Sequence, residues 1–276
     1  MRGMPTIDTT GARIDYASQG NGPAVLLIQG VGVIGEGWRP QVDGLSDRFR
    51  LLTFDNRGIG ASKILSGDPL SIEGMAADAW AVIDAAGVDR VHVVGHSMGG
   101  VIAQEVALAA PARVKSLSFL CTFARGREAT TLSAGMIVTG LRTRVGTRAM
   151  RRAAFLSLVL PDTVLATTNG VALAEELAPL FGHDLADQPP IVMKQLRAMA
   201  RYDATARLAT LASIPTMVVT GALDRIARPA YGRALATAIP GARYVEVTGG
   251  AHGVTIHSAN IVNDLLSTHF DAAEGT

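Results

Sequence analysis

Short apolar runs alternate along the chain with longer stretches in which apolar residues recur at helical spacing. A continuous apolar run such as Ala24–Ile28 is typical of a parallel strand, because such strands are covered on both faces. Similar runs predict strands at 51–54, 91–94, 117–120, 216–220 and 243–247, and an opening hairpin over 6–19 that turns at Thr10-Gly11.

Amphipathic helices fit between these strands. The helix predicted at 71–86 has one apolar face, which we expect to be buried, formed by Ile72, Met75, Ala79, Val82 and Ile83. Further helices are predicted at 98–109, 229–238 and 258–269, and residues 271–276 are expected to fray. The alternation predicts an α/β fold: a mostly parallel, twisted sheet of about eight strands with helices on both faces.

One segment, residues 123–210, interrupts this alternation. Its pattern is helical, it contains no convincing strand, and glycines and prolines break it repeatedly. Because strand-like sequence resumes afterwards, we interpret it as a helical cap inserted over the carboxyl-terminal edge of the sheet. The chain then divides into an α/β core, residues 1–122 and 211–276, and a cap, residues 123–210.

The cap is more basic than the rest of the chain. It holds 11 Lys or Arg and 7 Asp or Glu, a balance of +4, whereas the whole chain carries +1. Five of its arginines form either a solvated helix face or a site that steers an anionic substrate: Arg142, Arg144, Arg148, Arg151 and Arg152. Its methionines suggest an apolar pocket, although methionines more often only pack: Met136, Met150, Met193 and Met199.

Composition narrows the classes of partner. A chain of 276 residues with a net charge of +1 and no long basic block predicts neither a nucleic-acid nor a membrane-surface partner. Cys121 is the single cysteine, so no intrachain disulfide can form. The first residues lack the apolar core of a signal peptide, and no apolar run is long enough to span a bilayer. We therefore expect a cytoplasmic protein; its oligomeric state is open.

The strongest chemical signal is Gly95-x-Ser97-x-Gly99, which stands between the strand at 91–94 and a helical run at 101–109. In a sharp strand–turn–helix the serine Oγ is exposed, and glycines are needed where neighbouring chains would clash with a Cβ. The helix N-terminus also points its N–H groups at any negative charge that develops there. This context predicts that Ser97 is a nucleophile.

A serine nucleophile needs a base, and the base needs an orienting carboxylate. His252 follows the last strand on a glycine-rich loop that can reach over the sheet edge, and His257 is its main rival. Asp224 lies just beyond a buried strand, whereas the strand before it offers no acid until Glu128. We predict a catalytic triad of Ser97, Asp224 and His252.

The segment Phe54-Asp-Asn-Arg-Gly-Ile-Gly-Ala-Ser62 is similar to a turn typical of one large family. With the Ser97 motif, it makes the chain resemble the α/β-hydrolase fold superfamily, and within it the lid-bearing bacterial serine esterases, lactonases and cofactor-free haloperoxidases. The resemblance extends over nearly the whole chain outside the cap, and the order Ser97, Asp224, His252 agrees with it. It implies that Asp55 and Arg57 brace the loop beside the active site.

An oxyanion hole needs two preorganised N–H donors. The backbone of Met98, directly after the nucleophile, is the first candidate, and the resemblance makes the Val31 N–H the second. Gln29 stands where the family has a histidine, so the hydrogen bonding that fixes this loop is expected to differ. Gln29, Gly30 and His96 are candidate pocket residues, and the His96 side chain is expected to point away from the serine's.

Together these features predict a serine hydrolase that cleaves carboxylic esters. We expect its substrate to be a small, largely apolar acyl compound. We expect neither a cofactor nor a metal, since no zinc-site spacing or phosphate loop is present. A serine at position 97 argues against the haloalkane dehalogenases and epoxide hydrolases of the same fold. Alternatives are a lactonase, a carbon–carbon bond hydrolase acting on diketo acids, a perhydrolase or haloperoxidase side activity, and a non-catalytic ligand-binding protein.

Overall fold

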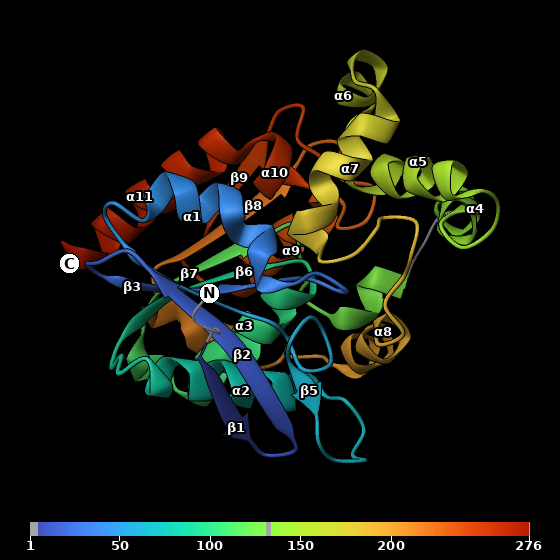
Figure 1. Ribbon diagram of the computed structural model, residues 1–276. Coiled ribbons are helices and arrows are strands. Elements are labelled where there is room, and N and C mark those ends of the chain that lie inside the picture. The colour runs from blue at the N-terminus through green and yellow to red at the C-terminus, as the bar shows by residue number, and fades with distance from the viewer. Residues whose placement is uncertain (1–4, 131–133, 276) are drawn as a thin grey trace.

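The computed structural model describes residues 5–130 and 134–275 and contains a central sheet flanked by helices (Figure 1). Within these residues the sheet has nine strands in the order β1-β2-β4-β3-β6-β7-β8-β9, with β5 paired to β2. The strands are β1 (Thr6–Thr9), β2 (Ala12–Gln19), β3 (Ala24–Ile28), β4 (Arg50–Phe54), β5 (Lys63–Ile64), β6 (Val91–His96), β7 (Val114–Leu120), β8 (Thr216–Gly221) and β9 (Arg243–Val247).

The predicted strand pattern is confirmed, with one addition. β1 and β2 form the antiparallel opening hairpin, β2 pairs antiparallel with β4, and every later pair from β4 to β9 is parallel. The sequence did not predict β5, which lies against β2 at Ala12 and Arg13. A strand of two residues is too short to show any alternation of polar and apolar positions.

The central strands are buried on both faces, as their continuous apolar runs predict. Every residue of β3, β6 and β8 is buried. Leu26, Val93 and Val218 have no solvent exposure at all. Such strands read as unbroken apolar sequence because helices cover both sides of a parallel sheet.

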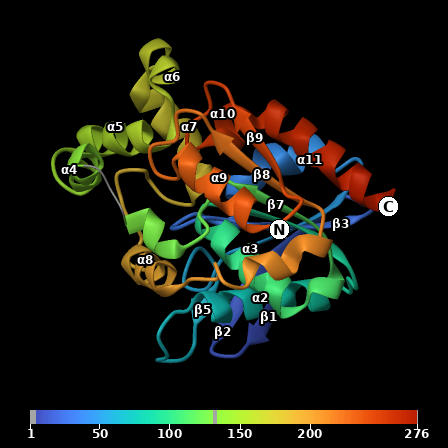
Figure 2. The same cartoon turned by 180° about the vertical axis from the view of Figure 1, so that it is seen from behind.

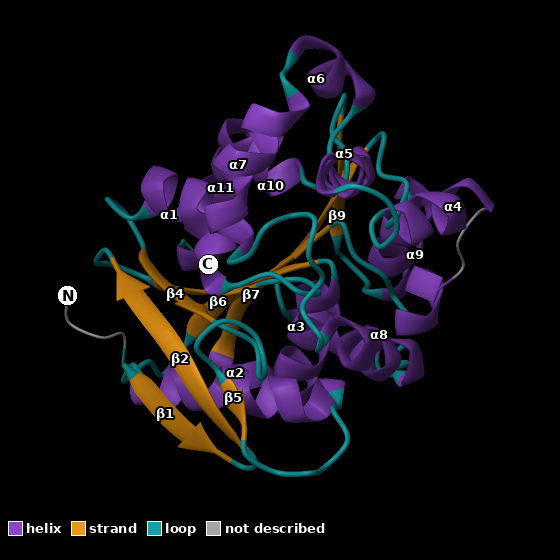
Figure 3. Cartoon of the chain, turned by 45° about the vertical axis from the view of Figure 1, so that its right-hand side comes forward, coloured by secondary structure: helices purple, strands orange, loops and turns teal. Residues whose placement is uncertain are grey.

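Helices cover both faces of the sheet, as predicted. In Figures 1 and 3, α1 (Arg39–Leu45) and α11 (Ala259–Glu274) lie on one face and α2 (Ile72–Ala85) and α3 (Met98–Ala109) on the other. The Ser71 hydroxyl caps α2 by accepting the Gly74 N–H at 3.1 Å. The remaining elements of the core are α9 (Pro229–Ala238), α10 (Val254–His257) and the 3₁₀ turns η1 (Gly35–Trp38), η2 (Pro111–Arg113) and η4 (Leu208–Ser213).

The expectation that residues 271–276 fray was wrong for residues 271–274, and Thr276 lies outside the described residues. Helix α11 continues to Glu274, whose carboxylate accepts hydrogen bonds from Lys115 and from His92 Nε2. The last helix is therefore fixed at its end by side chains of β6 and β7.

Between β7 and β8 the chain forms a group of helices. They are η3 (Gly126–Thr130), α4 (Ala134–Arg142), α5 (Arg148–Val159), α6 (Asp162–Thr167), α7 (Gly170–Phe181) and α8 (Val192–Arg201). Helices α5 and α7 share a small apolar cluster of their own, whereas Ala198 and Met199 of α8 belong to the main core. Figure 2 likewise has α8 apart from α4–α7. None of the described helices has the length and apolar character needed to cross a membrane.

Candidate active site

Ser97 occupies a sharp turn between β6 and α3. Its φ is +55°, a left-handed conformation that L side chains rarely adopt. A Cβ on Gly95 would lie 2.2 Å from the Gly99 carbonyl oxygen, and one on Gly99 would lie 2.0 Å from that of Ile28. Both positions therefore require glycine, and the local geometry is the strand–turn–helix that the motif predicts.

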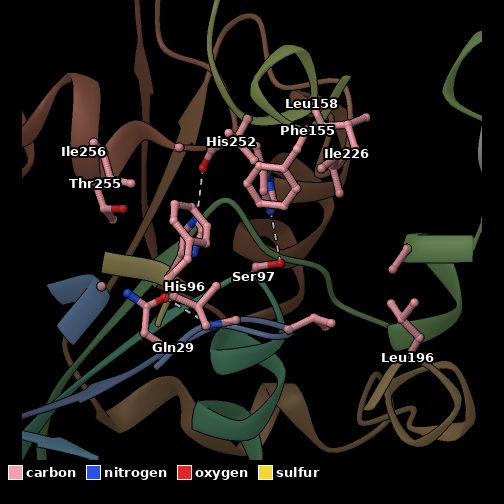
Figure 4. Close-up of a pocket in the computed structure, with 18 of the residues that line it drawn as sticks. Gln29, His96, Ser97, Phe155, Leu158, Leu196, Ile226, His252, Thr255 and Ile256 are labelled. Carbon is pink, nitrogen blue, oxygen red and sulfur yellow. Dashed lines mark hydrogen bonds between the residues drawn. The ribbon is translucent and has the colours of Figure 1, made fainter. Parts of the chain in front are cut away.

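The structure brings Ser97, His252 and Asp224 into one chain of hydrogen bonds. His252 Nε2 lies 3.1 Å from Ser97 Oγ, and His252 Nδ1 lies 2.9 Å from Asp224 Oδ2 (Figure 4). The other oxygen of Asp224 accepts the backbone N–H groups of Ile226 and Ala227, both at 2.8 Å. Because Asp224 is an acceptor, Nδ1 carries the ring proton and Nε2 is left to accept the serine hydroxyl.

Asp224 is almost fully buried, yet its carboxyl is held ionised. Burial acts to raise the pKa of Asp224, but the adjacent His252 and the two backbone N–H groups outweigh it, so the pKa falls below the usual 3.8. A carboxylate in this state orients the imidazole and stabilises the imidazolium that a proton transfer would form.

His96 lies beside this chain without joining it. Its Nε2–H donates to the backbone carbonyl oxygen of His252 at 2.8 Å, and the two rings lie 5.0 Å apart (Figure 4). Burial, together with the neighbouring His252, lowers the pKa of His96 to about 4, so the ring is neutral. The neutral ring fixes the backbone of His252.

The rival residues considered from the sequence lie elsewhere. His257 Nε2 accepts the Ala251 N–H at 3.1 Å and so stabilises the loop that carries His252. Glu128, in η3, accepts the N–H of Arg125, the residue before that turn, at 3.3 Å. The hydrogen bonds of the described residues join neither of them to Ser97 or His252.

The loop after β3 runs directly against Ser97. A Cβ on Gly30 would lie 3.1 Å from Ser97 Cβ. The Gly30 N–H donates to Gln29 Oε1 at 3.1 Å, and the Gly32 N–H donates to Gln195 Oε1 at 2.9 Å. The amide between them, that of Val31, belongs to a residue that lines the cavity above Ser97.

The backbone N–H of Met98 is the other candidate donor of the oxyanion hole. It is the first residue of α3, so its N–H has no partner within its own helix. Met98 was expected from its place after Ser97 and Val31 from the family resemblance, whereas Gln195, whose partner Gly32 is 163 positions away in the chain, was not expected.

Asp55 and Arg57 brace the surrounding loops. Asp55 accepts the Gly35 N–H at 2.7 Å and the Ala61 N–H at 2.9 Å. Arg57 pairs with Asp78 at 2.6 Å, and both side chains are largely buried. Neither Asp55 nor Arg57 lines the cavity, so they act on the site through the loops they hold.

A cavity of about 210 Å³ opens above Ser97. Helices α5, α7 and α8 supply much of its wall, mainly through Phe155, Leu158, Phe181, Leu196 and Met199. Gln29, Gly30 and His96 line it on the side of the core, together with Ser97 and His252. Among the described residues that line it, no side chain is a lysine, arginine, aspartate or glutamate.

The five clustered arginines do not reach this cavity. Arg152 Nε donates to Asp184 Oδ1 at 2.9 Å, and Arg148 donates to Asp187 Oδ2 at 2.9 Å. The hydrogen bonds to Arg152 and Arg148 hold the pKa of Asp184 well below its usual range. Arg148 and Arg152 thus tie α5 to the loop between α7 and α8, which is a structural role.

One cluster in the described chain has residue types that can bind metal. The side-chain donor atoms of His96, Cys121 and His252 lie within 4.8 Å of one another. A metal-binding cysteine must be deprotonated, but burial raises the pKa of the Cys121 thiol well above its usual value. His96 Nε2 is already committed to the His252 carbonyl. The donor set is therefore a poor fit for a resident metal ion.

Comparison with known proteins agrees with this geometry. The family model described as alpha/beta hydrolase fold matches residues 23–257. The protein named "Putative carbamate hydrolase RutD" of Azorhizobium caulinodans is 33% identical over 267 residues, which cover 95% of this chain and 97% of that one.

Solved structures share the fold over nearly their full length. The structure titled "Putative non-heme bromoperoxidase BpoC" from Mycobacterium tuberculosis has a TM-score of 0.80 and 26% identity, and the match covers 98% of both chains. The enol-lactonase from Burkholderia xenovorans has a TM-score of 0.74 and 24% identity over 97% of this chain and 100% of that one, a likeness of fold. The chain is a hydrolase that belongs to the α/β-hydrolase fold family.

Proposed function

We propose that this hydrolase cleaves neutral carboxylic esters with apolar acyl groups through a Ser97 acyl-enzyme. One observation carries the proposal: the hydrogen-bonded chain Ser97–His252–Asp224 opens into an apolar cavity without a charged Lys, Arg, Asp or Glu side chain among its described lining residues. A serine nucleophile that opens into an apolar pocket suits an uncharged acyl substrate.

The reaction proceeds by two acyl transfers. Ser97 Oγ attacks the ester carbonyl carbon while its proton passes to His252 Nε2, and the tetrahedral intermediate expels the alcohol, which takes that proton. Water then attacks the acyl-enzyme with His252 again as base, and the carboxylic acid leaves as Ser97 regains its proton. Asp224 stays ionised throughout and keeps Nε2 free to accept.

The N–H groups of Met98 and Val31 stabilise the oxyanion in both steps. The amides on either side of Val31 are already bonded to Gln29 and Gln195, which supports Val31 as the donor of this loop. Each donor in such a hole is typically worth about a hundred- to a thousandfold in rate.

The cavity also bears on substrate charge. A substrate carboxylate buried there would meet no cation, and an unpaired buried charge is strongly unfavourable. This counts against anionic diketo acids, the substrates of the carbon–carbon bond hydrolases. Because α5, α7 and α8 wall the cavity, residues 123–210 act in this proposal as a cap that sets acyl-chain selectivity.

A second candidate is cleavage of neutral carbamate esters, favoured by the 33% identity with the protein named a putative carbamate hydrolase. The same nucleophile would form a carbamoyl-enzyme, since a carbamate offers the same carbonyl to Ser97. Lactones follow the ester mechanism and are tested alongside.

The experiment compares p-nitrophenyl esters from acetate to octanoate with p-nitrophenyl carbamates and simple lactones, for the wild type and Ser97→Ala. We expect ester turnover that depends on chain length and falls at least a thousandfold in Ser97→Ala, in line with the loss of a triad nucleophile. A carbamate preference would favour the second candidate. Turnover that survives in Ser97→Ala, or none at all by folded wild type, would overturn the serine-hydrolase proposal.

A further inference from the structure

We propose that Gln195, on α8 of the helical segment, is a positioning residue for the oxyanion loop: its side-chain carbonyl anchors the Gly32 amide and thereby orients the Val31 N–H. The inference rests on the proposed function, because Val31 matters only if an oxyanion forms at Ser97. It makes part of the catalytic machinery depend on a helix of the cap.

The anchor is a buried, well-formed hydrogen bond. The Gly32 N–H donates to Gln195 Oε1 at 2.9 Å, and Gln195 has no solvent exposure. Gly32 is buried as well, so loss of this acceptor would leave a buried N–H unsatisfied, a state that is usually avoided. The loop would then move until that N–H found another partner.

Gln195 is not explained by packing alone. Its Nε2 is buried and has no hydrogen-bond partner among the described residues. An apolar side chain of similar length would fill the same space without that unsatisfied group. The carbonyl end of Gln195 is therefore the part of the side chain that the site uses.

Two glutamines hold the amides on either side of Val31. Gln29 Oε1 accepts the Gly30 N–H at 3.1 Å on one side, and Gln195 accepts the Gly32 N–H on the other. With both neighbouring peptide units fixed, the Val31 N–H has little freedom to turn. Figure 4 shows Gln29 beside His96, on the loop that approaches Ser97.

Gly32 lies in close contact with α8. Its φ is +73°, and a Cβ there would lie 3.0 Å from Val192 Cγ2 at the start of that helix. His183 Nε2 lies 3.3 Å from the Gly32 carbonyl oxygen, a longer contact than that to Gln195. The same helix adds Leu196 and Met199 to the cavity wall. Helix α8 thus both lines the substrate cavity and holds the loop that carries the Val31 N–H.

The test uses two substitutions that are close to glutamine in shape. Gln195→Met removes the acceptor and retains the bulk. Gln195→Glu keeps an acceptor oxygen of the same reach, because a carboxyl group accepts a hydrogen bond whether or not it is protonated. Arg197→Ala, on the exposed face of α8, is the matched control. We expect Gln195→Met to lower kcat for a p-nitrophenyl ester about ten- to a hundredfold, because small displacements of catalytic groups have effects of that order.

KM should change little, and Gln195→Glu and Arg197→Ala should stay close to the wild type. A packing role predicts the opposite order, because methionine would be tolerated and a buried acid would not. Wild-type kcat in Gln195→Met, or an equal loss in Gln195→Glu, would therefore overturn the positioning role while leaving the esterase proposal intact.

Hydrogen exchange of the Gly32 amide, followed by NMR on isotope-labelled protein, tests the anchor without any substrate. We expect faster exchange in Gln195→Met and unchanged exchange in Gln195→Glu. If the wild type cleaves no ester, carbamate or lactone, the proposed function fails, and this measurement still decides between an anchored and an unanchored Gly32. Equal protection in all three proteins would refute the anchor.

Discussion

His96 donates its Nε2–H to the backbone carbonyl oxygen of His252 across 2.8 Å. The residue directly before the proposed nucleophile thus fixes the main chain of the proposed base, while Asp224 fixes its side chain. Burial lowers the pKa of His96 to about 4, so the ring makes this contact without adding a charge beside His252. The proposed base is thus held from two directions, by His96 at the end of β6 and by Asp224 in the loop after β8.

Replacing His96 should therefore affect the rate more than substrate binding. His96→Phe retains a ring but has no donor, and we expect kcat to fall about tenfold, the effect of a misplaced base. His96→Gln can still donate through its amide and should recover part of that loss. Steady-state kinetics on one ester measures both variants, and an unchanged kcat in His96→Phe would rule out the positioning role.

Phe155 should set the length of acyl chain that the cavity accepts. It lines the cavity from α5 and meets Phe181 edge-to-face, with ring centroids 5.1 Å apart. Phe155→Ala opens space there. Each further methylene that the acyl chain buries in this space contributes about 0.8 kcal/mol to binding, so we expect the acyl chain of the preferred p-nitrophenyl ester to be about two carbons longer.

Met150, on the same helix but 58% exposed, gives the control, and Met150→Ala should leave the chain-length profile unchanged. An identical profile in Phe155→Ala would mean that the acyl group does not occupy this side of the cavity.

Arg152 should prove structural. Its guanidinium is bonded to Asp184, and it does not line the cavity. We expect Arg152→Ala to lower the melting temperature slightly and to leave unchanged the ratio of kcat/KM for p-nitrophenyl butyrate to that for an anionic succinate half-ester. A selective loss of activity on the anionic ester would instead assign Arg152 to substrate binding.

Stability should fall as the pH drops below 6.5, and His92 should account for part of the fall. Burial lowers the pKa of His92 to about 4 despite its bond to Glu274. The unfolded chain takes up a proton near pH 6.5 and the folded chain only near pH 4. Acid therefore favours the unfolded state throughout this window, by about 2 kcal/mol between pH 7 and pH 5.

Urea unfolding of the wild type and His92→Gln at pH 7 and pH 5 measures this effect. Glutamine does not titrate, so the free energy of unfolding of the variant should lose about 2 kcal/mol less than that of the wild type over this interval. Equal losses in the two proteins would show that His92 is protonated in the folded state as readily as in the unfolded one.

The features that the sequence predicted are those that short stretches of chain encode. Ser97 stands out because Gly95 and Gly99 flank it between a strand and a helix, a pattern carried by five consecutive residues. The buried strands stand out because both of their faces are apolar. Two elements are too short to show a repeat of apolar positions: helix α1, with seven residues, and strand β5, with two.

What the sequence could not predict depends on long-range contacts. Residues 271–274 are helical because Glu274 meets Lys115 and His92, which are far away in the chain. The hydrogen bond from Gly32 to Gln195 joins positions 163 apart in the chain, so no local pattern marks Gln195. The clustered arginines left open a solvated helix face or an anion site, and only the positions of Asp184 and Asp187 show that Arg148 and Arg152 form ion pairs.

The contact between Gln195 and Gly32 has a consequence for protein engineering. If residues 123–210 set acyl-chain selectivity as proposed, replacing them with another segment would be a way to change that selectivity. The replacement would also remove the acceptor that holds the loop beside Ser97, so the chimera would acquire a new pocket and lose turnover together. A successful graft would need to carry a glutamine, or another acceptor of equal reach, to the position that faces Gly32.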